Sequence, residues 1–217
     1  TALSTSSEYG QAVAIQSDGK IVVAGQTTGS TTKGDIAVVR YNTNGSLDAT
    51  FDSDGQISTD FNSDTDQAYA VKVQPDGKIV VAGTTQISGG TPDFALVRYN
   101  ANGSLDSTFG TGGKVKTPVG SSYDYASALA LQADGKLVVA GQSKNASNFD
   151  VALVRYNTNG SLDITFDTDG KVTTAIGNAD DAGYGAALQS DGKIVVVGDS
   201  NFSGNTDFAV VRYNSDG

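Results

Sequence analysis

The sequence predicts an all-β fold, a β-propeller of four-stranded antiparallel blades, from a long repeat, its strand pattern and its turns. The segment Asp18–Gly25 recurs almost unchanged at Asp76–Gly83, Asp134–Gly141 and Asp191–Gly198. The four copies lie about 57 residues apart and contain strand-like segments without a helical pattern. A repeat of this length and kind is typical of propellers and other repeat arrays.

The second copy illustrates the strands of one unit. Its apolar runs predict strands at Tyr69–Gln74, Ile79–Gly83, Asp93–Asn100 and Gly113–Thr117. A turn at Asp76-Gly77 joins the first two, and another at Asn102-Gly103 follows the third. Both dipeptides favour tight turns because their residues tolerate positive φ.

The third strand of each copy indicates a sheet that is covered on both faces. Phe94 and Leu96 share one face, and Ala95 and Val97 share the other, so both faces are apolar. Such a strand fits between blades stacked face to face. The first strands carry small residues, which suit the crowded position nearest the central axis: Ala12, Ala14, Ala70, Ala128, Ala130, Gly185 and Ala187. A parallel β-helix is the alternative, although its coils are usually shorter.

The repeats predict a single propeller domain over residues 1–217. Its units span approximately residues 1–58, 59–116, 117–173 and 174–217. A chain of this length can bury a sizeable core. Because the first residue is not Met and four-bladed rings are uncommon, we expect a part of a longer chain. Alternatively, Thr1–Thr5 completes the last blade and closes the ring.

The composition narrows the classes of partner. The chain has 24 acidic and 14 basic residues and a formal charge of −10, which argues against nucleic acid. Cys, His, Met and Trp are absent, while Asp, Asn, Ser, Thr and Gly are abundant. This profile indicates a secreted or cell-surface bacterial protein. No apolar run is long enough to predict a membrane-spanning helix.

Three motifs together resemble a known family. They are Ser-Leu-Asp-x-Thr-Phe, as at 46–51, Asp-Gly-Lys-(Ile/Leu)-Val-Val, as at 76–81, and Arg-Tyr-Asn, as at 98–100. The combination is similar to the delta-60 repeat, a bacterial β-propeller repeat of unknown function. The resemblance covers the whole chain and implies the propeller fold and a secreted or envelope setting. It implies no catalytic or binding residues.

Two Asp-x-Asp-Gly segments resemble calcium loops. Asp52 and Asp54 stand in one segment, and Asp167 and Asp169 in the other. Calcium favours clustered carboxylate oxygens, and the following Gly lets the backbone turn around an ion. The second copy has Gly110–Gly113 at this place, without a carboxylate, so a purely structural turn is the alternative. A bound Ca²⁺ is therefore possible, and no other cofactor is expected.

The Arg-Tyr-Asn motif predicts an internal ion pair. Arg40 shares a strand face with Ile36 and Val38, which suggests that the guanidinium is partly buried. A half-buried guanidinium needs a carboxylate, and Asp48 of the same unit is the expected partner. The corresponding pair in the second copy is Arg98 with Asp106.

The sequence predicts that the protein is not an enzyme. It has no His for acid–base work and no Cys nucleophile, and Glu8 is its only Glu. An Asp-based glycoside hydrolase is a distant alternative, since that chemistry needs two carboxyl groups. Asp64 with Asp66, or Asp180 with Asp181, would be its candidates, although solvated loops explain these residues as well.

The loops suggest a binding surface. Two sets of connections differ between the copies and emerge on the same side of an antiparallel blade, as binding loops often do. Their aromatic residues Tyr123, Tyr125, Phe149 and Phe202 can stack on sugars or anchor a protein. We therefore expect a non-enzymatic secreted or cell-surface module for protein interaction or self-assembly, or else a lectin-like protein that binds glycans through these loops. A third interpretation is that the loops differ only because their sequences are unconstrained and have drifted.

Overall fold

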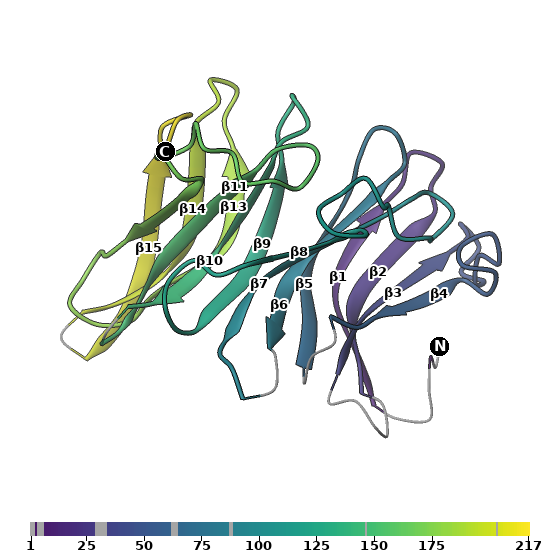
Figure 1. Cartoon of the computed structure of the whole chain (residues 1–217), viewed down its shortest axis with the longest axis horizontal. Helices are drawn as coiled ribbons and strands as arrows, with labels where there is room; N and C mark the ends of the chain where they lie inside the picture. The colour runs from purple at the N-terminus through teal and green to yellow at the C-terminus, as the bar shows by residue number, and fades with distance from the viewer. Residues whose placement is uncertain are drawn as a thin grey trace. The chain divides into compact units, whose positions relative to one another are not determined.

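The computed structural model describes residues 3, 7–28, 34–61, 65–86, 89–145, 147–202 and 204–217. These residues form an all-β structure without a helix, in antiparallel sheets that follow one another along the chain (Figure 1). The predicted fold class is confirmed. The chain divides into two compact units, one of Thr1–Gly90 and Ala95–Lys116 and the other of Thr91–Phe94 and Thr117–Gly217. The division after residue 116 coincides with a predicted repeat boundary.

The first unit contains two four-stranded sheets, apart from the first residues of β7 and the last residue of β8. Their strands pair in chain order: β1 (Glu8–Ile15), β2 (Ile21–Thr27), β3 (Asp35–Tyr41) and β4 (Gln56–Thr59), then β5 (Thr65–Val73), β6 (Ile79–Gln86), β7 (Pro92–Tyr99) and β8 (Lys114–Thr117).

The second unit repeats this arrangement. One sheet has four strands, and the other has three among the described residues. Their strands are β9 (Asp124–Leu131), β10 (Leu137–Lys144), β11 (Phe149–Tyr156) and β12 (Lys171–Thr174), then β13 (Asp181–Leu188), β14 (Ile194–Phe202) and β15 (Asn205–Tyr213).

The core of each unit lies between its two sheets. In the first unit, Val22 and Ile36 of one sheet belong to the same buried cluster as Ile79 and Val81 of the other. The second unit has an equivalent cluster, in which Val138 and Leu153 accompany Ile194 and Val196. Burying such aliphatic side chains contributes roughly 1.5–3 kcal/mol each. The third strands β3, β7 and β11 are buried at nearly every position, as the sequence predicted, whereas Phe208 and Val210 of β15 are exposed.

A β-bulge recurs in the first strand of every sheet. One extra residue interrupts the pairing each time: Gln11, Tyr69, Ser127 and Tyr184. The bulge brings a backbone carbonyl against the glycine that ends the Asp18–Gly25 segment and its copies. A Cβ at Gly83 would lie 1.8 Å from the carbonyl oxygen of Gln67, and Gly25, Gly141 and Gly198 have equivalent contacts. The glycine of the repeat is therefore a steric requirement of the bulge.

The predicted ion pairs are confirmed. Arg40 donates from Nε to Oδ2 of Asp48 over 2.7 Å, and Arg98 donates to Asp106 over 2.8 Å. A third pair joins Arg155 to Asp163 over 2.7 Å. Each guanidinium also covers a phenylalanine ring from the end of the Ser-Leu-Asp-x-Thr-Phe motif: Phe51, Phe109 and Phe166. This motif is thus a structural device that holds the turn after the third strand.

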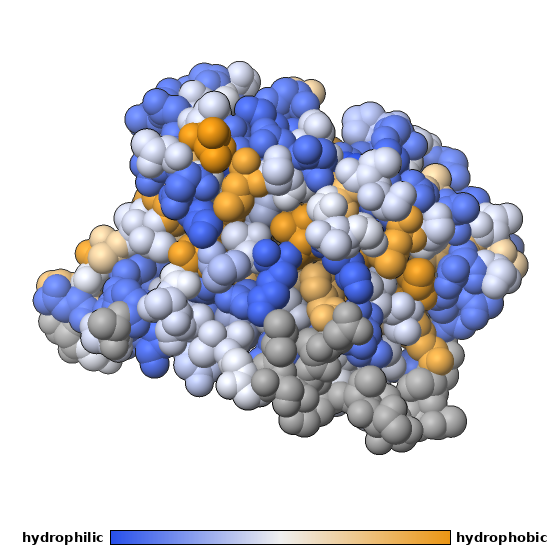
Figure 2. All heavy atoms as spheres, viewed as in Figure 1, coloured by the Kyte–Doolittle hydropathy of each residue, from blue (hydrophilic) through white to orange (hydrophobic). Residues whose placement is uncertain are grey.

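The surface is mostly hydrophilic on the face shown in Figure 2, where hydrophobic side chains form small separate areas. Larger exposed apolar side chains occur on β1 and on the sheet of β13, β14 and β15, including Val13, Tyr184, Phe208 and Val210. No helix in the described part of the chain is long and apolar enough to cross a membrane.

Candidate functional site

The two Asp-x-Asp-Gly segments form left-handed turns. Asp52 and Ser53 have φ values of 46° and 69°, and Asp167 and Thr168 have values of 44° and 70°. Asp is one of the few non-glycine residues that adopt this conformation readily. The second copy has a glycine at the position of Asp52, and this residue, Gly110, also has a positive φ. The turn itself thus accounts for the first Asp of each segment.

The second Asp of each segment stabilises the same turn. Asp54 accepts a hydrogen bond from the backbone N–H of Gln56, and Asp169 accepts one from Lys171, both over 2.9 Å. Such contacts to a backbone N–H two residues later are typical of Asx turns. They hold the entry into β4 and β12.

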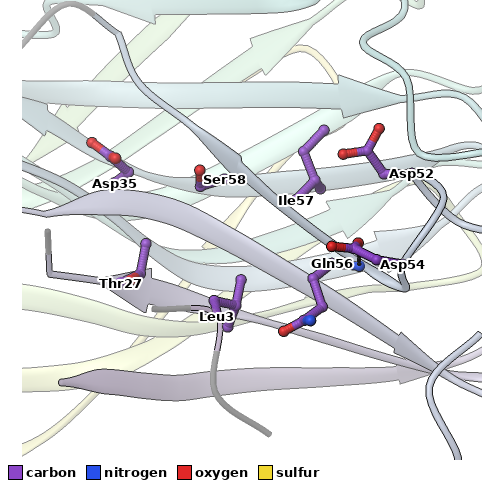
Figure 3. A pocket seen from close by; sticks show the side chains of 8 residues that line it. All are labelled: Leu3, Thr27, Asp35, Asp52, Asp54, Gln56, Ile57 and Ser58. Carbon is purple, nitrogen blue, oxygen red and sulfur yellow. Dashed lines mark hydrogen bonds between the residues drawn. The ribbon is translucent and has the colours of Figure 1, made fainter. Parts of the chain in front are cut away.

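Figure 3 shows the pocket of the first unit that Asp52 and Asp54 line, together with Asp35 and with polar side chains of β4. The pocket has a volume of about 380 Å³. In this view Asp35 lies at one end, and Asp52 and Asp54 at the other. The pocket therefore does not gather its three carboxylates around one point.

Among the described residues, one group of three carboxylates is close enough to share an ion, with ligand atoms within 4.8 Å of one another. It consists of Asp35, Asp60 and Asp66. None of the predicted residues Asp52, Asp54, Asp167 and Asp169 belongs to it. The structure thus places the predicted calcium ligands in turns.

Three of the four predicted ligand-binding aromatics form one cluster in the second unit. The rings of Tyr123 and Tyr125 are stacked with centroids 6.4 Å apart, and Tyr125 and Phe149 are 5.9 Å apart. Lys144 places its Nζ 5.6 Å from the ring centroid of Tyr123 and 5.7 Å from that of Phe149. Phe202 is 59% exposed at the end of β14 and makes none of these ring contacts.

Phe149 also belongs to a pocket of about 340 Å³ in the same unit. The pocket combines two aromatic rings with carboxylates, amides and a hydroxyl. It is lined by Gln142, Phe149, Asp180, Ala182, Tyr184, Asp199, Asn201 and Thr206. One sheet of the unit contributes residues of β10 and β11. The other contributes residues of β13, β14 and β15, together with Asp180 just before β13, so both sheets build the pocket.

Hydrogen bonds order the wall of this pocket. Asp180 accepts from the backbone N–H of Phe149 over 2.9 Å, and Asn148 donates to the carbonyl of Ala179 over 2.7 Å. Tyr184 donates its hydroxyl to Oδ2 of Asp199 over 3.2 Å. Partial burial, followed by the nearby charge of Asp199, raises the pKa of the Tyr184 hydroxyl above its ordinary value. The phenol therefore remains a donor at neutral pH.

Buried carboxylates anchor the loops that lead into the first strand of each sheet. Asp181 accepts the backbone N–H of Ile176 over 2.7 Å, and Asp124 accepts that of Val119 over 2.7 Å. Asp66 and Glu8 likewise accept a hydrogen bond from the backbone N–H five residues earlier, that of Phe61 and of Leu3 respectively. Asp66 and Asp181 are fully buried, so neither sits in a solvated loop as the sequence suggested. Asp64 lies outside the described residues.

Sequence reasoning missed most of the pocket. It named Phe149 and Asp180, but not Gln142, Tyr184, Asp199 or Asn201. The residue at the bulge differs between the copies, but other positions of the same strand differ as well, so no sequence signal singled out Tyr184. Bulges re-aim side chains, and this one turns Tyr184 toward the pocket.

A family model matches residues 16–51, 74–109, 132–166 and 189–217, which together make up more than half of the chain. Its description is a β-propeller domain of unknown function, DUF5122. The chain belongs to the DUF5122 β-propeller family. Its four matched segments confirm a propeller repeat family of unknown function, whereas the name delta-60 repeat stays a prediction. No curated protein matches the sequence.

The DUF5122 chain is also similar in fold to solved glycoside hydrolases. An α-L-arabinofuranosidase from Clostridium thermocellum matches at 11% identity and a TM-score of 0.48, over 94% of this chain and 68% of that chain. An endo-arabinase from Bacteroides thetaiotaomicron matches at 11% and 0.47, over 95% and 74%. The RS223 β-xylosidase matches at 8% and 0.45, over 98% and 76%. At such identities the likeness concerns the fold alone.

Two expectations are corrected, that the protein is a non-enzymatic interaction or assembly module and that it is not an enzyme. Both rested on the absence of His and Cys. Glycoside hydrolysis depends on carboxylates instead, so the missing residue types do not exclude this chemistry. The non-enzymatic assignment is therefore withdrawn.

Proposed function

We propose that the DUF5122 chain binds carbohydrate in the pocket of its second unit. The single observation that carries the proposal is the lining of this pocket, in which Phe149 and Tyr184 accompany Asp180, Asp199 and Asn201. Sugars present apolar C–H faces and a rim of hydroxyl groups. Aromatic rings suit the faces, and carboxylate and amide groups suit the hydroxyls.

The polar groups of the pocket are of the kinds that fix a sugar in orientation. Asp180 and Asp199 offer acceptor oxygens, while Asn201 and Gln142 offer both donors and acceptors. Each carboxylate already holds one internal donor, the N–H of Phe149 or the hydroxyl of Tyr184. These contacts orient the carboxylates before a ligand arrives, which reduces the entropy lost on binding.

The neighbouring aromatic cluster extends this surface. Phe149 lines the pocket and also contacts Tyr125, which stacks on Tyr123. Tyr123 is 40% exposed, so its ring is accessible next to the pocket. A chain of sugars longer than one residue can therefore occupy the pocket and continue over these rings. A secreted or cell-surface location, where polysaccharides are encountered, belongs to the same proposal.

Cleavage of the bound glycan is the second candidate function. The observation that favours it is the presence of two carboxylates, Asp180 and Asp199, in one pocket. Retaining and inverting glycoside hydrolases both use a pair of carboxyl groups that flank the scissile bond. Solved glycoside hydrolases of similar fold agree with a glycan partner, although the proposal rests on the pocket alone.

A glycan array probed with the purified chain tests the binding proposal. We expect binding that falls at least tenfold in Phe149→Ala and in Tyr184→Ala. Tyr9→Ala is the matched control, because Tyr9 is a 52% exposed aromatic of β1 in the first unit and does not line the pocket. Loss of binding in the control as well, or an empty array from folded protein, would refute the proposal.

Incubation of each bound glycan, followed by an assay for new reducing ends, separates binding from cleavage. If cleavage occurs in the pocket, Asp180→Asn and Asp199→Asn both abolish the new ends. Bound glycan that stays intact on prolonged incubation leaves carbohydrate binding as the function and excludes the second candidate.

A further inference from the structure

The charges that line the pocket of the second unit are all negative. Its ionisable side chains besides the tyrosine are Asp180 and Asp199, and the other polar groups are the neutral amides of Gln142 and Asn201 and the hydroxyl of Thr206. The whole chain, these carboxylates included, carries a formal net charge of −10. A ligand with carboxylate or sulfate groups would meet repulsion without a compensating cation.

A lysine lies beside the aromatic cluster. Lys144 directs its ammonium group to the rings of Tyr123 and Phe149, where it is 5.6 and 5.7 Å from their centroids. Lys144 is not among the residues that line the pocket. The side chains that line the pocket therefore carry only negative charge, and the ammonium group of Lys144 is engaged with two aromatic rings beside it.

The Tyr184–Asp199 hydrogen bond fixes a carboxylate beside an aromatic ring on one wall of the pocket. Asp199 accepts the hydroxyl proton of Tyr184, and the ring of Tyr184 is 57% exposed. An ammonium group near this wall can approach a carboxylate and an aromatic ring together. Both interactions favour a cation, by charge and by the ring quadrupole.

We propose that the pocket selects amino sugars whose amine is free and protonated, in preference to neutral sugars and against uronic acids. This inference rests on the proposed carbohydrate binding and names the class of sugar. The ammonium group lies toward Asp199 and Asp180, and the sugar face lies on Phe149. Polymers of 2-amino-2-deoxyhexoses offer such groups on every residue.

Titration calorimetry with three matched tetrasaccharides tests the inference: a glucosamine tetramer, its N-acetylated counterpart and a galacturonic acid tetramer. Acetylation removes the charge while the sugar ring is retained. We expect the glucosamine tetramer to bind at least tenfold more tightly than the acetylated one, and the galacturonic acid tetramer to show no heat of binding. Raising the salt concentration should reduce the preference, because screening weakens the attraction.

Two variants locate the charge effect. Asp199→Asn should reduce the preference for the free amine to less than threefold. Asp207→Asn should preserve it, because Asp207 is an exposed carboxylate that does not line the pocket. Near-ultraviolet circular dichroism confirms that each variant is folded.

The outcomes distinguish a failure of this inference from a failure of the proposed carbohydrate binding on which it rests. Equal affinity for the amine and acetylated tetramers, tighter binding of the uronic acid, or a preference that survives in Asp199→Asn would overturn the charge selection and leave carbohydrate binding in place. If none of the tetramers binds and the glycan array is also empty, the proposed function fails and the inference fails with it.

Discussion

Arg98 donates a hydrogen bond from Nε to Oδ2 of Asp106 over 2.8 Å, and both side chains are buried. Lys78 approaches the same carboxylate oxygen within 3.3 Å, and Thr108 donates its hydroxyl to the other oxygen over 2.7 Å. The arrangement occurs again around Asp48 and Asp163. Each of these carboxylates therefore ties the start of the second strand and the third strand of its repeat to the turn that follows the third strand.

Removal of either partner should strongly destabilise the first unit. We expect Asp106→Ala and Arg98→Ala each to lower the free energy of unfolding by about 3–5 kcal/mol. The first takes the carboxylate from the buried guanidinium, and the second leaves the buried carboxylate with only the partly exposed Lys78 as its cation. Asp76→Ala is the control, because Asp76 lies 3.5 Å from the same Lys78 but is exposed, and should cost less than about 1 kcal/mol. Urea denaturation measures all three, and an Asp106→Ala protein as stable as the parent would disprove the role of the pair.

Acid should weaken the protein through these carboxylates. Burial alone would raise the pKa of Asp106, but hydrogen bonds from Thr108 and the charge of Arg98 outweigh it and lower the pKa to about 2. The same balance lowers the pKa of Asp48 and of Asp163. Because the folded pKa lies below the unfolded value of about 3.9, the stabilisation is present above that value and is lost as the pH falls toward 2. Urea midpoints between pH 7 and pH 2 should fall over this window, and less steeply in Asp106→Asn.

The glycine opposite each bulge should resist substitution. In Gly83→Ala the new Cβ would lie 1.8 Å from the carbonyl oxygen of Gln67, so the bulge must shift. We expect a loss of about 3 kcal/mol or more in the free energy of unfolding. Gly34→Ala, where the nearest atom is 3.7 Å away, should stay within about 0.5 kcal/mol of the parent. Similar melting temperatures for the two variants would rule out the steric explanation.

The loop anchor of the last sheet should affect both stability and binding. Asp181→Ala removes the acceptor of the Ile176 and Gly177 N–H groups, which costs about 1–3 kcal/mol. The loop it holds leads directly to Asp180, so we expect glycan affinity to fall at least tenfold. Asp66→Ala removes the equivalent anchor of the first unit, and should destabilise without changing glycan affinity. Equal loss of affinity in both variants would show that the anchor acts through general unfolding.

The two Asp-x-Asp-Gly turns should not bind calcium. The left-handed turns already explain Asp52 and Asp167, and the Asx contacts explain Asp54 and Asp169. We expect Asp54→Asn and Asp169→Asn to leave unchanged the difference in melting temperature between millimolar Ca²⁺ and chelator. A calcium-dependent rise that disappears in Asp54→Asn would instead establish an ion at the first turn.

The sequence by itself determined the repeat, the strand order, the turns and the Arg–Asp pairs. These features depend on short spacings within one repeat, where the alternation of side chains and the turn dipeptides decide which groups meet. It also indicated Tyr123, Tyr125 and Phe149, because aromatics at variable positions stand out against the repetitive scaffold. It was wrong to place all three in loops, since Tyr125 lies in β9 and Phe149 begins β11. Tertiary structure decided the rest. Phe149, Tyr184 and Asp199 come together only because two sheets pack with a defined register and a bulge turns Tyr184 toward the pocket. Packing also left Phe202 outside the aromatic cluster and buried Asp66 and Asp181, since contacts across sheets depend on the positions of strands rather than on spacing along the chain.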